Sequence, residues 1–352
     1  MADLMSYLRH YRAHLAVILG NAAFAAIFLT IVLSGFHQPT PHQLPVGIVA
    51  PAPVARTLEH GLDARVPGAF DLRPVAGVAR ARAELSRGDI DGAVVVEPQR
   101  IALLTAEAGG TAPTQAITGA VAALASKAGR QLSVTDVVPP SPGDSQGLSS
   151  FFLLLCTLIP SLATGMAVGH ALRHGRLAPR VGVLVAVAGI VGLAAAGIAD
   201  GISGLGHYWA VAGIVGLFSL AISAPMAALG HIKPHLGALC VLAFLVFGIP
   251  ASGGPADLAA FGPGFLRSLT SGLPLGAGAN AVRDTIYFHA AHTTGHVLVL
   301  AAYALTGVAA LCLVAVVLRR RGGRPGRPRP AGVEHLIEAH YGLELAQAGS
   351  EA

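Results

Sequence analysis

The chain has 352 residues, a mean hydropathy of +0.65 and only 12% charged residues, roughly half the charged fraction of an ordinary soluble domain. This composition excludes two soluble domains of that length and favours a membrane bundle with an inserted domain. The formal net charge is +5, but the basic residues are not gathered on a folded domain. We therefore predict no nucleic-acid partner and attribute the excess to membrane topology.

The N-terminal residues predict a membrane anchor. Residues 1–14 are interpreted as a cytoplasmic interfacial helix, because leucines and tyrosines recur at helical spacing around Arg9 and Arg12. A disordered lead-in is the alternative. Residues 15–35 predict the first transmembrane helix. Their apolar run is too long for a typical signal-peptide core and no clear A-x-A site follows, so we expect an uncleaved signal anchor.

Residues 38–146 predict an α/β domain inserted after the first span. Its β-branched runs alternate with amphipathic helical patterns, and "GDIDG" (88–92) forms a turn between a helix and a strand. The sheet is expected to be largely parallel, with right-handed crossovers. The expected strands are 46–50, 70–73, 92–96, 101–105 and 132–138, and the expected helices are 54–64, 78–86 and 113–127. The proline-rich stretch 137–147 is the connector back to the membrane.

Five further apolar runs lie within residues 149–318. Each is close to the roughly 17–25 residues that cross a bilayer core, and none contains Asp, Glu, Lys or Arg. The expected spans are 149–169, 181–199, 208–229, 236–252 (the shortest) and 294–318. The predicted fold class is thus an α-helical polytopic membrane protein with six transmembrane helices and an extracytoplasmic α/β domain between the first and the second.

Small residues and prolines punctuate these spans. Close packing of helices in lipid requires small side chains, and the sequence offers Gly165, Gly169, Gly189, Ala194, Gly197, Gly213 and Gly216. Pro160 and Pro225 are expected to kink their helices. The three cysteines all lie in apolar runs and are expected to be small core residues without disulfides.

The flanking charges predict the orientation. Arg9 and Arg12 precede the first span, three arginines lie between the second and third spans, Lys233 lies between the fourth and fifth, and six arginines follow the last. On the opposite side, the loop around Asp200 has no Lys or Arg, and the segment before the last span has only Arg267 and Arg283. The positive-inside rule therefore places both termini in the cytoplasm, in a multi-pass plasma-membrane protein. Residues 319–352 form a cytoplasmic tail, with an Arg/Pro/Gly linker before either a short amphipathic helix or a disordered end.

Three segments together resemble a known family. They are "ARAELSRGDIDGAVVVEP" (81–98), "DVVPPSPGDSQGLSSFF" (136–152) and "FGPGFLRSLTSGLPLGAGANAVRDTIYF" (261–288). With the order of spans, these segments resemble the phage-infection-protein-like branch of type-2 ABC exporter permeases. The resemblance implies a homodimeric or pseudo-dimeric pore and a broken helical hairpin at about 261–281. It also implies a cytoplasmic coupling element that docks a separate ATPase, for which the candidates are His170, Arg173, His174, Arg176 and Arg180.

The expected function follows from the resemblance and from motifs that the chain lacks. There is no G-x-x-x-x-G-K-[ST], G-x-S-x-G or H-E-x-x-H motif, so we predict neither an enzyme nor a cofactor. The expectation is the permease subunit of an exporter for a hydrophobic or amphipathic substrate, with its ATPase supplied in trans. The alternative is a membrane-anchored receptor or cell-envelope scaffold that acts through the α/β domain.

Polar residues near the last span are the remaining candidates. In "HAAHTTGH", His289, His292 and His296 would share one face of a helix and could hold a metal, but no acidic residue lies between them. An interfacial or pore-mouth role is therefore the stronger interpretation. Four further residues are candidates for the outer pore mouth: Arg267, Arg283, Asp284 and Asp200. Arg283 and Asp284 either pair with neighbours there or are solvated. Asp200 is either a proton or ion site or, as its neighbouring glycines favour, an ordinary loop residue.

Overall fold

The structure is a computed structural model, and it describes residue 26, residues 41–171, 177–232 and 271–322, and six positions between 236 and 249. The interfacial helix, the tail after Gly322, Arg267 and all of the predicted first span except Ala26 lie outside the described residues, as does most of the fifth span. The chain divides into two compact units, Met1–Leu311 and Cys312–Ala352. The first unit contains the α/β domain and most of the described helices.

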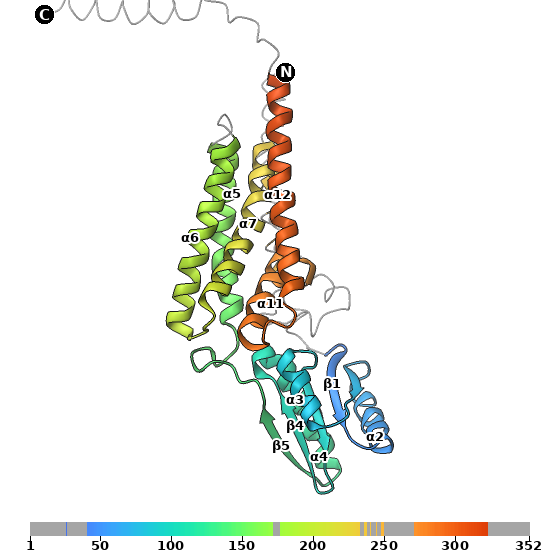
Figure 1. The fold of residues 1–352 in the computed structure, drawn as a ribbon. Helices are drawn as coiled ribbons and strands as arrows, with labels where there is room; N and C mark the ends of the chain where they lie inside the picture. Colours follow the sequence, from blue (N-terminus) through green and yellow to red (C-terminus); the bar gives the residue numbers. More distant parts are fainter. Residues whose placement is uncertain are drawn as a thin grey trace, which may run out of the picture. The chain divides into compact units, whose positions relative to one another are not determined.

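The α/β domain has the predicted alternation of strands and helices (Figure 1). In chain order its elements are β1 (Leu44–Val49), α2 (Ala52–Asp63), β2 (Phe70–Pro74), α3 (Val78–Arg87), β3 (Gly92–Val96), β4 (Arg100–Thr105), η1 (Glu107–Gly109), α4 (Thr111–Lys127) and β5 (Gln131–Asp136). The strand order is β2-β1-β3-β4-β5, and every pair is parallel except the hairpin β3–β4. This confirms the largely parallel sheet.

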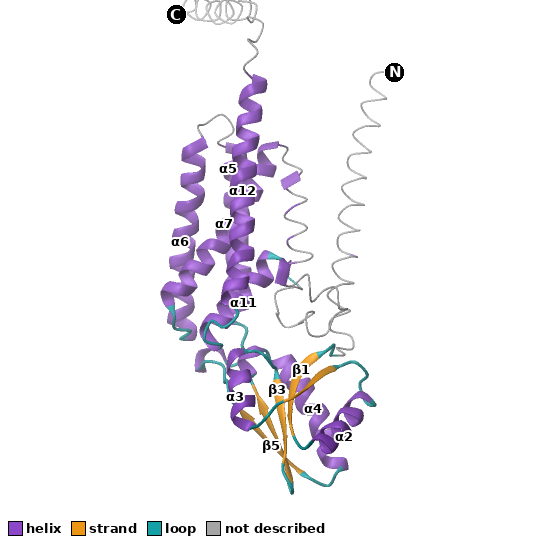
Figure 2. Cartoon of the chain, turned by 45° about the vertical axis from the view of Figure 1, so that its right-hand side comes forward, coloured by secondary structure: helices purple, strands orange, loops and turns teal. Residues whose placement is uncertain are grey.

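Each face of the sheet is covered by helices, and the strand residues alternate between the two faces (Figure 2). On one face Ala93, Val95 and Leu104 pack with Ala81 and Leu85 of α3. On the other, strand residues pack against Ile117, Val121 and Ala125 of α4 and against Leu58 of α2; they are Leu44, Val46, Val94, Ile101 and Leu103. Burial on both faces explains why β3 is a continuous apolar run rather than an alternating one.

Four of the described helices are long and apolar enough to cross a membrane, so this is a multi-pass membrane protein. They are α5 (Ser149–Ala171), α6 (Leu177–Ser203), α7 (Tyr208–Ile232) and α12 (Thr293–Gly322). They match the second, third, fourth and sixth predicted spans within a few residues. Pro160 and Pro225 lie inside α5 and α7.

Glycines allow α5, α6 and α7 to approach closely. A Cβ on Gly165 would lie 2.5 Å from the Ser223 carbonyl oxygen, and a Cβ on Gly192 would lie 2.4 Å from that of Ala212. Phe218 is fully buried at the centre of the resulting core. Two of the glycines expected to pack closely, Gly189 and Gly213, instead have no atom near a built Cβ.

A fifth described helix, α11 (Pro274–Tyr287), precedes α12. It is about 21 Å long, too short to cross the bilayer core of about 30 Å, yet most of its residues are buried. Gly278 packs against Leu154 of α5 and Phe218 of α7. The C-terminal part of the expected broken hairpin is therefore a helix that continues past Ala281; the part before Ser271 lies outside the described residues.

Candidate functional site at the junction of the domain and the helices

The turn between α11 and α12 inserts an aromatic side chain into the α/β domain. Phe288 is 4% exposed and belongs to the same buried cluster as Ala81 and Leu85 of α3. A Cβ built on Gly88 would contact its ring at 3.3 Å, and one on Gly109 at 3.5 Å. Residues 200 positions apart in the sequence thus share one core, which fixes this turn to the domain.

Gly88 serves this contact in two ways. It ends α3 in the left-handed conformation, with φ of 73°, and the amide of Asp89 donates to the Glu84 carbonyl oxygen at 2.9 Å. Glycine adopts this conformation without strain, and its lack of a side chain leaves room for Phe288. The predicted end of this helix at Gly88 is confirmed.

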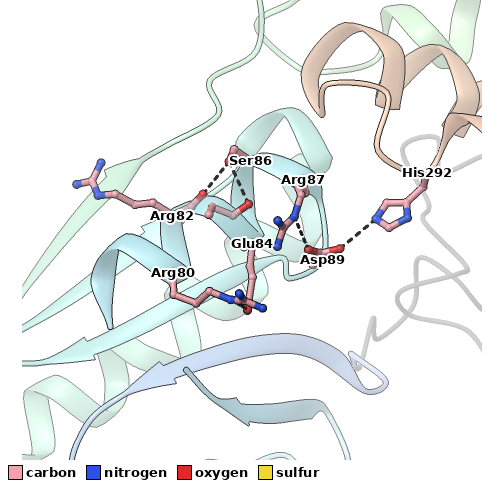
Figure 3. A network of polar contacts seen from close by, with 8 residues as sticks. Arg80, Arg82, Glu84, Ser86, Arg87, Asp89 and His292 are labelled. Atoms are coloured by element: carbon pink, nitrogen blue, oxygen red, sulfur yellow. Dashed lines mark hydrogen bonds and ion pairs between the residues drawn. The ribbon is translucent and has the colours of Figure 1, made fainter. Parts of the chain in front are cut away.

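Asp89 connects the end of α3 to the start of α12 (Figure 3). One carboxylate oxygen lies 3.2 Å from His292 Nε2, and the other accepts a hydrogen bond from Arg87 Nε at 2.9 Å. Asp89 and His292 line a hollow of about 550 Å³, together with Arg73 and Glu84. The His292 side chain is 51% exposed, so the contact is a solvent-exposed polar contact rather than a buried ion pair.

A second polar connection joins α11 to the connector that precedes α5. The Tyr287 hydroxyl donates to Asp144 Oδ2 at 3.2 Å, and the Ser141 hydroxyl donates to the Ser203 carbonyl oxygen at the end of α6, at 3.0 Å. Burial raises the pKa of the Tyr287 phenol above its ordinary value. The hydroxyl therefore stays protonated and remains a donor at neutral pH. The connector at this point contains the short helix η2 (Pro142–Asp144).

Asp284 and His296 form a third polar contact, between α11 and the first turn of α12. Asp284 Oδ2 lies 3.5 Å from His296 Nε2, and the two side chains are only 14% and 19% exposed. The neighbouring Arg283 is 8% exposed. Burial raises the pKa of the Asp284 carboxyl, and the positive charges of His296 and Arg283 oppose this rise. Arg283 and Asp284 are thus largely buried in the structure, with Asp284 close to His296.

The turn that carries these contacts has a strained backbone. His289 and Ala290 have φ of 53° and 58°, the left-handed region that costs a non-glycine residue about 1–2 kcal/mol. Such strained conformations persist when the surrounding contacts hold the backbone in place. Here those contacts are Phe288 on one side of the turn and the two histidine–aspartate contacts on the other.

The three histidines do not converge on a metal. The expectation of a shared helical face is wrong, because α12 begins only at Thr293 and His289 lies in the preceding turn. His292 and His296 instead contact different aspartates, Asp89 and Asp284. Within the part of the chain that the structure describes, no three metal-ligating side chains are grouped.

The other predicted site residues are dispersed. Asp200 lies in the last turn of α6, not in a loop as expected, and it accepts a hydrogen bond from the amide of Gly206 in the following loop at 2.7 Å. Among the coupling candidates, His170 is exposed at the end of α5, whereas Arg180 is 2% exposed within α6 and so does not lie on a docking surface. Arg173, His174 and Arg176 fall outside the described residues.

An apolar groove of about 500 Å³ runs between α5 and α6 near the same junction. Ser149 and Ser203 lie at one end of the groove, with their hydroxyls 3.1 Å apart, and Pro160 and Val191 lie farther along the two helices. Cys156 lines the groove and is exposed, which corrects the expectation of a core cysteine. No Asp, Glu, Lys or Arg lines it, so its chemistry suits a hydrocarbon chain or ring system.

Sequence reasoning missed the residues that build the junction, namely Asp89, Asp144, Tyr287 and Phe288. The only local signal was that "GDIDG" and "TIYFHAAH" place aromatic and charged side chains in turns, where a solvated role is the ordinary interpretation. Neither turn indicates its partner, because the contacts join segments far apart in the sequence. No family model, curated protein or solved structure matches this chain.

Proposed function

We propose that this chain is the membrane-spanning permease subunit of an ABC-type exporter for a hydrophobic or amphipathic substrate. The observation that carries the proposal is the uncharged α5–α6 groove, which lies directly beside the junction with the α/β domain. A bundle with such a groove can hold an apolar molecule while it passes between bilayer and domain. The short buried helix α11 before the last span adds support, because the resembled permeases have a helical hairpin at that place.

The proposal includes six spans. A fifth crossing between α7 and α11 is supported by described residues: Gly237 lies near Gly230 at the end of α7, Phe244 is buried in the bundle core, and Gly248 lies near Leu275 in α11. These positions support a return of the chain from the far end of α7 to the start of α11. The first span, residues 15–35, is proposed from its sequence alone.

The α/β domain is proposed to face outward from the plasma membrane, with both termini in the cytoplasm. The domain-side loop between α6 and α7 has no Lys or Arg, whereas Arg173 and Arg176 follow α5 in the sequence and Lys233 follows α7, at the opposite ends of these helices. Trp209, 78% exposed, lies at the domain-side start of α7, a position typical of the membrane–water interface. Labelling of Ala64→Cys by an impermeant maleimide, in a chain without native cysteines, tests this orientation: we expect labelling on intact cells.

Energy would come from an ATPase in trans, bound by a dimer of this chain. We expect an ATPase to co-purify with the wild-type chain, and to be lost when His170, Arg173, His174 and Arg176 are all replaced by alanine. Replacement of Ala64 by serine, on the exposed surface of the α/β domain, is the control that should retain it. If no ATPase co-purifies, energisation by ATP is wrong.

The groove gives the sharper test of the transport function. Ala194→Trp places a large side chain in the groove, whereas Ala186→Trp places the same side chain on an exposed part of α6 that does not line it. In cells loaded with a lipophilic fluorescent dye, we expect the first variant to lose most of the efflux that the wild type adds, and the second to retain it. Equal efflux by both variants, or none by the wild type, contradicts the proposal.

A hollow in the α/β domain supports the receptor or scaffold as a second candidate. It measures about 530 Å³ and is lined by Arg56, Glu59, His60 and Asp63 of α2 with apolar residues beneath them. Such a mixture suits a polar ligand. If Arg56→Ala and His60→Ala abolish the cellular phenotype of the chain while Ala194→Trp does not, the receptor function is favoured over export.

A further inference from the structure

We propose that Asp284 and His296 form a proton-binding site at the head of α12, and that the bound proton determines how firmly the α11–α12 turn is held in the α/β domain. The ligand is a single proton, shared between one carboxylate oxygen and one imidazole nitrogen. The inference does not depend on the proposed export function, since the site lies in contacts that any function of the chain would use.

The geometry leaves a place for the proton. Asp284 Oδ2 is buried and accepts no hydrogen bond from the described residues. Its nearest charged neighbour, His296 Nε2 at 3.5 Å, lies just beyond ordinary hydrogen-bonding distance. A buried carboxylate oxygen without a donor is costly. A proton on Oδ2 removes that cost, because a neutral carboxyl is much less costly to bury than a carboxylate.

Few other charges face the pair. Arg283 and His292 are the remaining groups that act on Asp284, and both favour its ionised form. His292 is itself in contact with Asp89, which also binds Arg87. The elements packed against α11 are α5, α7 and η1. The helices α5 and α7 carry no Asp, Glu, Lys or Arg in their described spans, and Glu107 of η1 is exposed and is not among the groups that act on Asp284. The charge state of the site therefore depends on Asp284, Arg283 and the two histidines.

The same contact controls the strained turn. Asp284 and His296 bracket residues 288–292, and Thr285 and Thr293 connect the two helices just beside them, with their hydroxyl oxygens 3.2 Å apart. The turn holds two left-handed residues, His289 and Ala290, and carries Phe288 into the domain core. A change in the distance between Asp284 and His296 thus acts directly on the segment that fixes the domain to the bundle.

The direction of the effect follows from the linkage between proton binding and folding. Burial raises the pKa of Asp284 above its ordinary value of 3.8, so the folded chain holds a proton at pH values at which the unfolded chain has released it. The stability that this proton contributes is fully present below the ordinary pKa and is lost as the pH rises through the raised pKa. We therefore expect the turn to be held most firmly at acidic pH and to loosen as Asp284 ionises.

Infrared titration of the full chain in lipid nanodiscs tests the site directly. We expect a band of a protonated carboxylic acid that persists above the ordinary titration range of aspartate and disappears in Asp284→Asn. Asp200→Asn is the matched control, because that carboxylate also lies near the end of a span, and it should leave the band unchanged. In His296→Gln the midpoint should move to higher pH, because the variant removes a positive charge that favours ionisation.

Hydrogen exchange of the amides of residues 288–292 provides the second measurement. After correction for the intrinsic pH dependence, we expect protection in the wild type to fall across the same midpoint, and to stay high at all pH values in Asp284→Asn. A band that survives in Asp284→Asn overturns the proposal. So does an unmoved or lowered midpoint in His296→Gln, which serves as the test if Asp284→Asn fails to fold, or turn protection that is unaffected by pH in the wild type.

Discussion

Tyr287 and Asp144, 143 positions apart, are joined by a hydrogen bond of 3.2 Å at the junction between the α/β domain and the helices. The other carboxylate oxygen of Asp144 accepts from the amides of Leu148 and Ser149, each at 2.9 Å. These amides belong to the start of α5, whose first N–H groups have no partners within the helix. One buried side chain therefore caps a membrane helix and holds α11 beside it.

Replacement of Asp144 by alanine is expected to destabilise the folded chain more than replacement by asparagine. Alanine removes the acceptor for both amides and for the Tyr287 hydroxyl, at a cost of about 1–3 kcal/mol. Asparagine retains one oxygen for the cap. Reversible unfolding in mixed micelles measures the difference, and Tyr287→Phe, combined with Asp144→Asn in a double-mutant cycle, isolates the bond between them. Additive effects would show that the Tyr287–Asp144 bond contributes nothing.

Phe288→Ala is expected to release the α11–α12 turn from the domain. The side chain is nearly fully buried, and truncation of a buried phenylalanine costs about 3–5 kcal/mol. We expect limited proteolysis to cleave near residues 288–292 much faster in the variant than in the wild type. Phe152→Ala, on an aromatic residue that is 49% exposed on α5, should leave that cleavage unchanged. Equal cleavage of the two variants would contradict the anchoring role.

The Asp89–His292 contact is expected to contribute little to stability. Both side chains are partly exposed, and exposed ion pairs contribute about 0.2–1 kcal/mol that salt reduces further. A double-mutant cycle with Asp89→Asn and His292→Gln at low and high salt measures the coupling energy. A coupling energy that exceeds this range, or one that salt leaves unchanged, would show that the contact contributes more to stability than an exposed ion pair does.

The sequence predicts the α/β domain well because its signals are local. Leu58 and Leu62 mark one face of α2, Gly88 ends α3, and the β-branched run of β3 is long enough for one buried strand. The spans follow equally from the absence of charge over about 20 residues. In both cases, residues close together in the sequence determine the element.

The junction was not predictable for the opposite reason. His292 is next to two threonines and two alanines, and nothing in that stretch indicates a carboxylate at position 89. The spacing of the three histidines suggested a metal site only on the assumption that the last helix begins before His289. The structure starts α12 at Thr293 and so directs His292 and His296 to different partners. Which partner each histidine contacts depends on tertiary packing, and the hydrophobic periodicity of the sequence does not determine that packing.

The close packing of α6 and α7 gives a matched pair of glycine variants three residues apart. A Cβ on Gly192 would lie 2.4 Å from the Ala212 carbonyl oxygen, whereas a Cβ on Gly189 meets no atom within 4 Å. We expect Gly192→Ala to force the helices apart at a cost of about 1–3 kcal/mol. Gly189→Ala should be neutral or stabilising by up to about 1 kcal/mol, because alanine favours the helix.

Thermal unfolding of the two variants in nanodiscs measures this difference, and the comparison isolates packing because both changes add one methyl group to the same helix. Gly307→Ala extends the test to α12, since its Cβ would lie 2.4 Å from Pro225 Cδ. It should resemble Gly192→Ala. If Gly189→Ala destabilises the chain as much as the other two, the loss reflects helix flexibility rather than contact, and the close approach of α6 and α7 does not hold in the membrane.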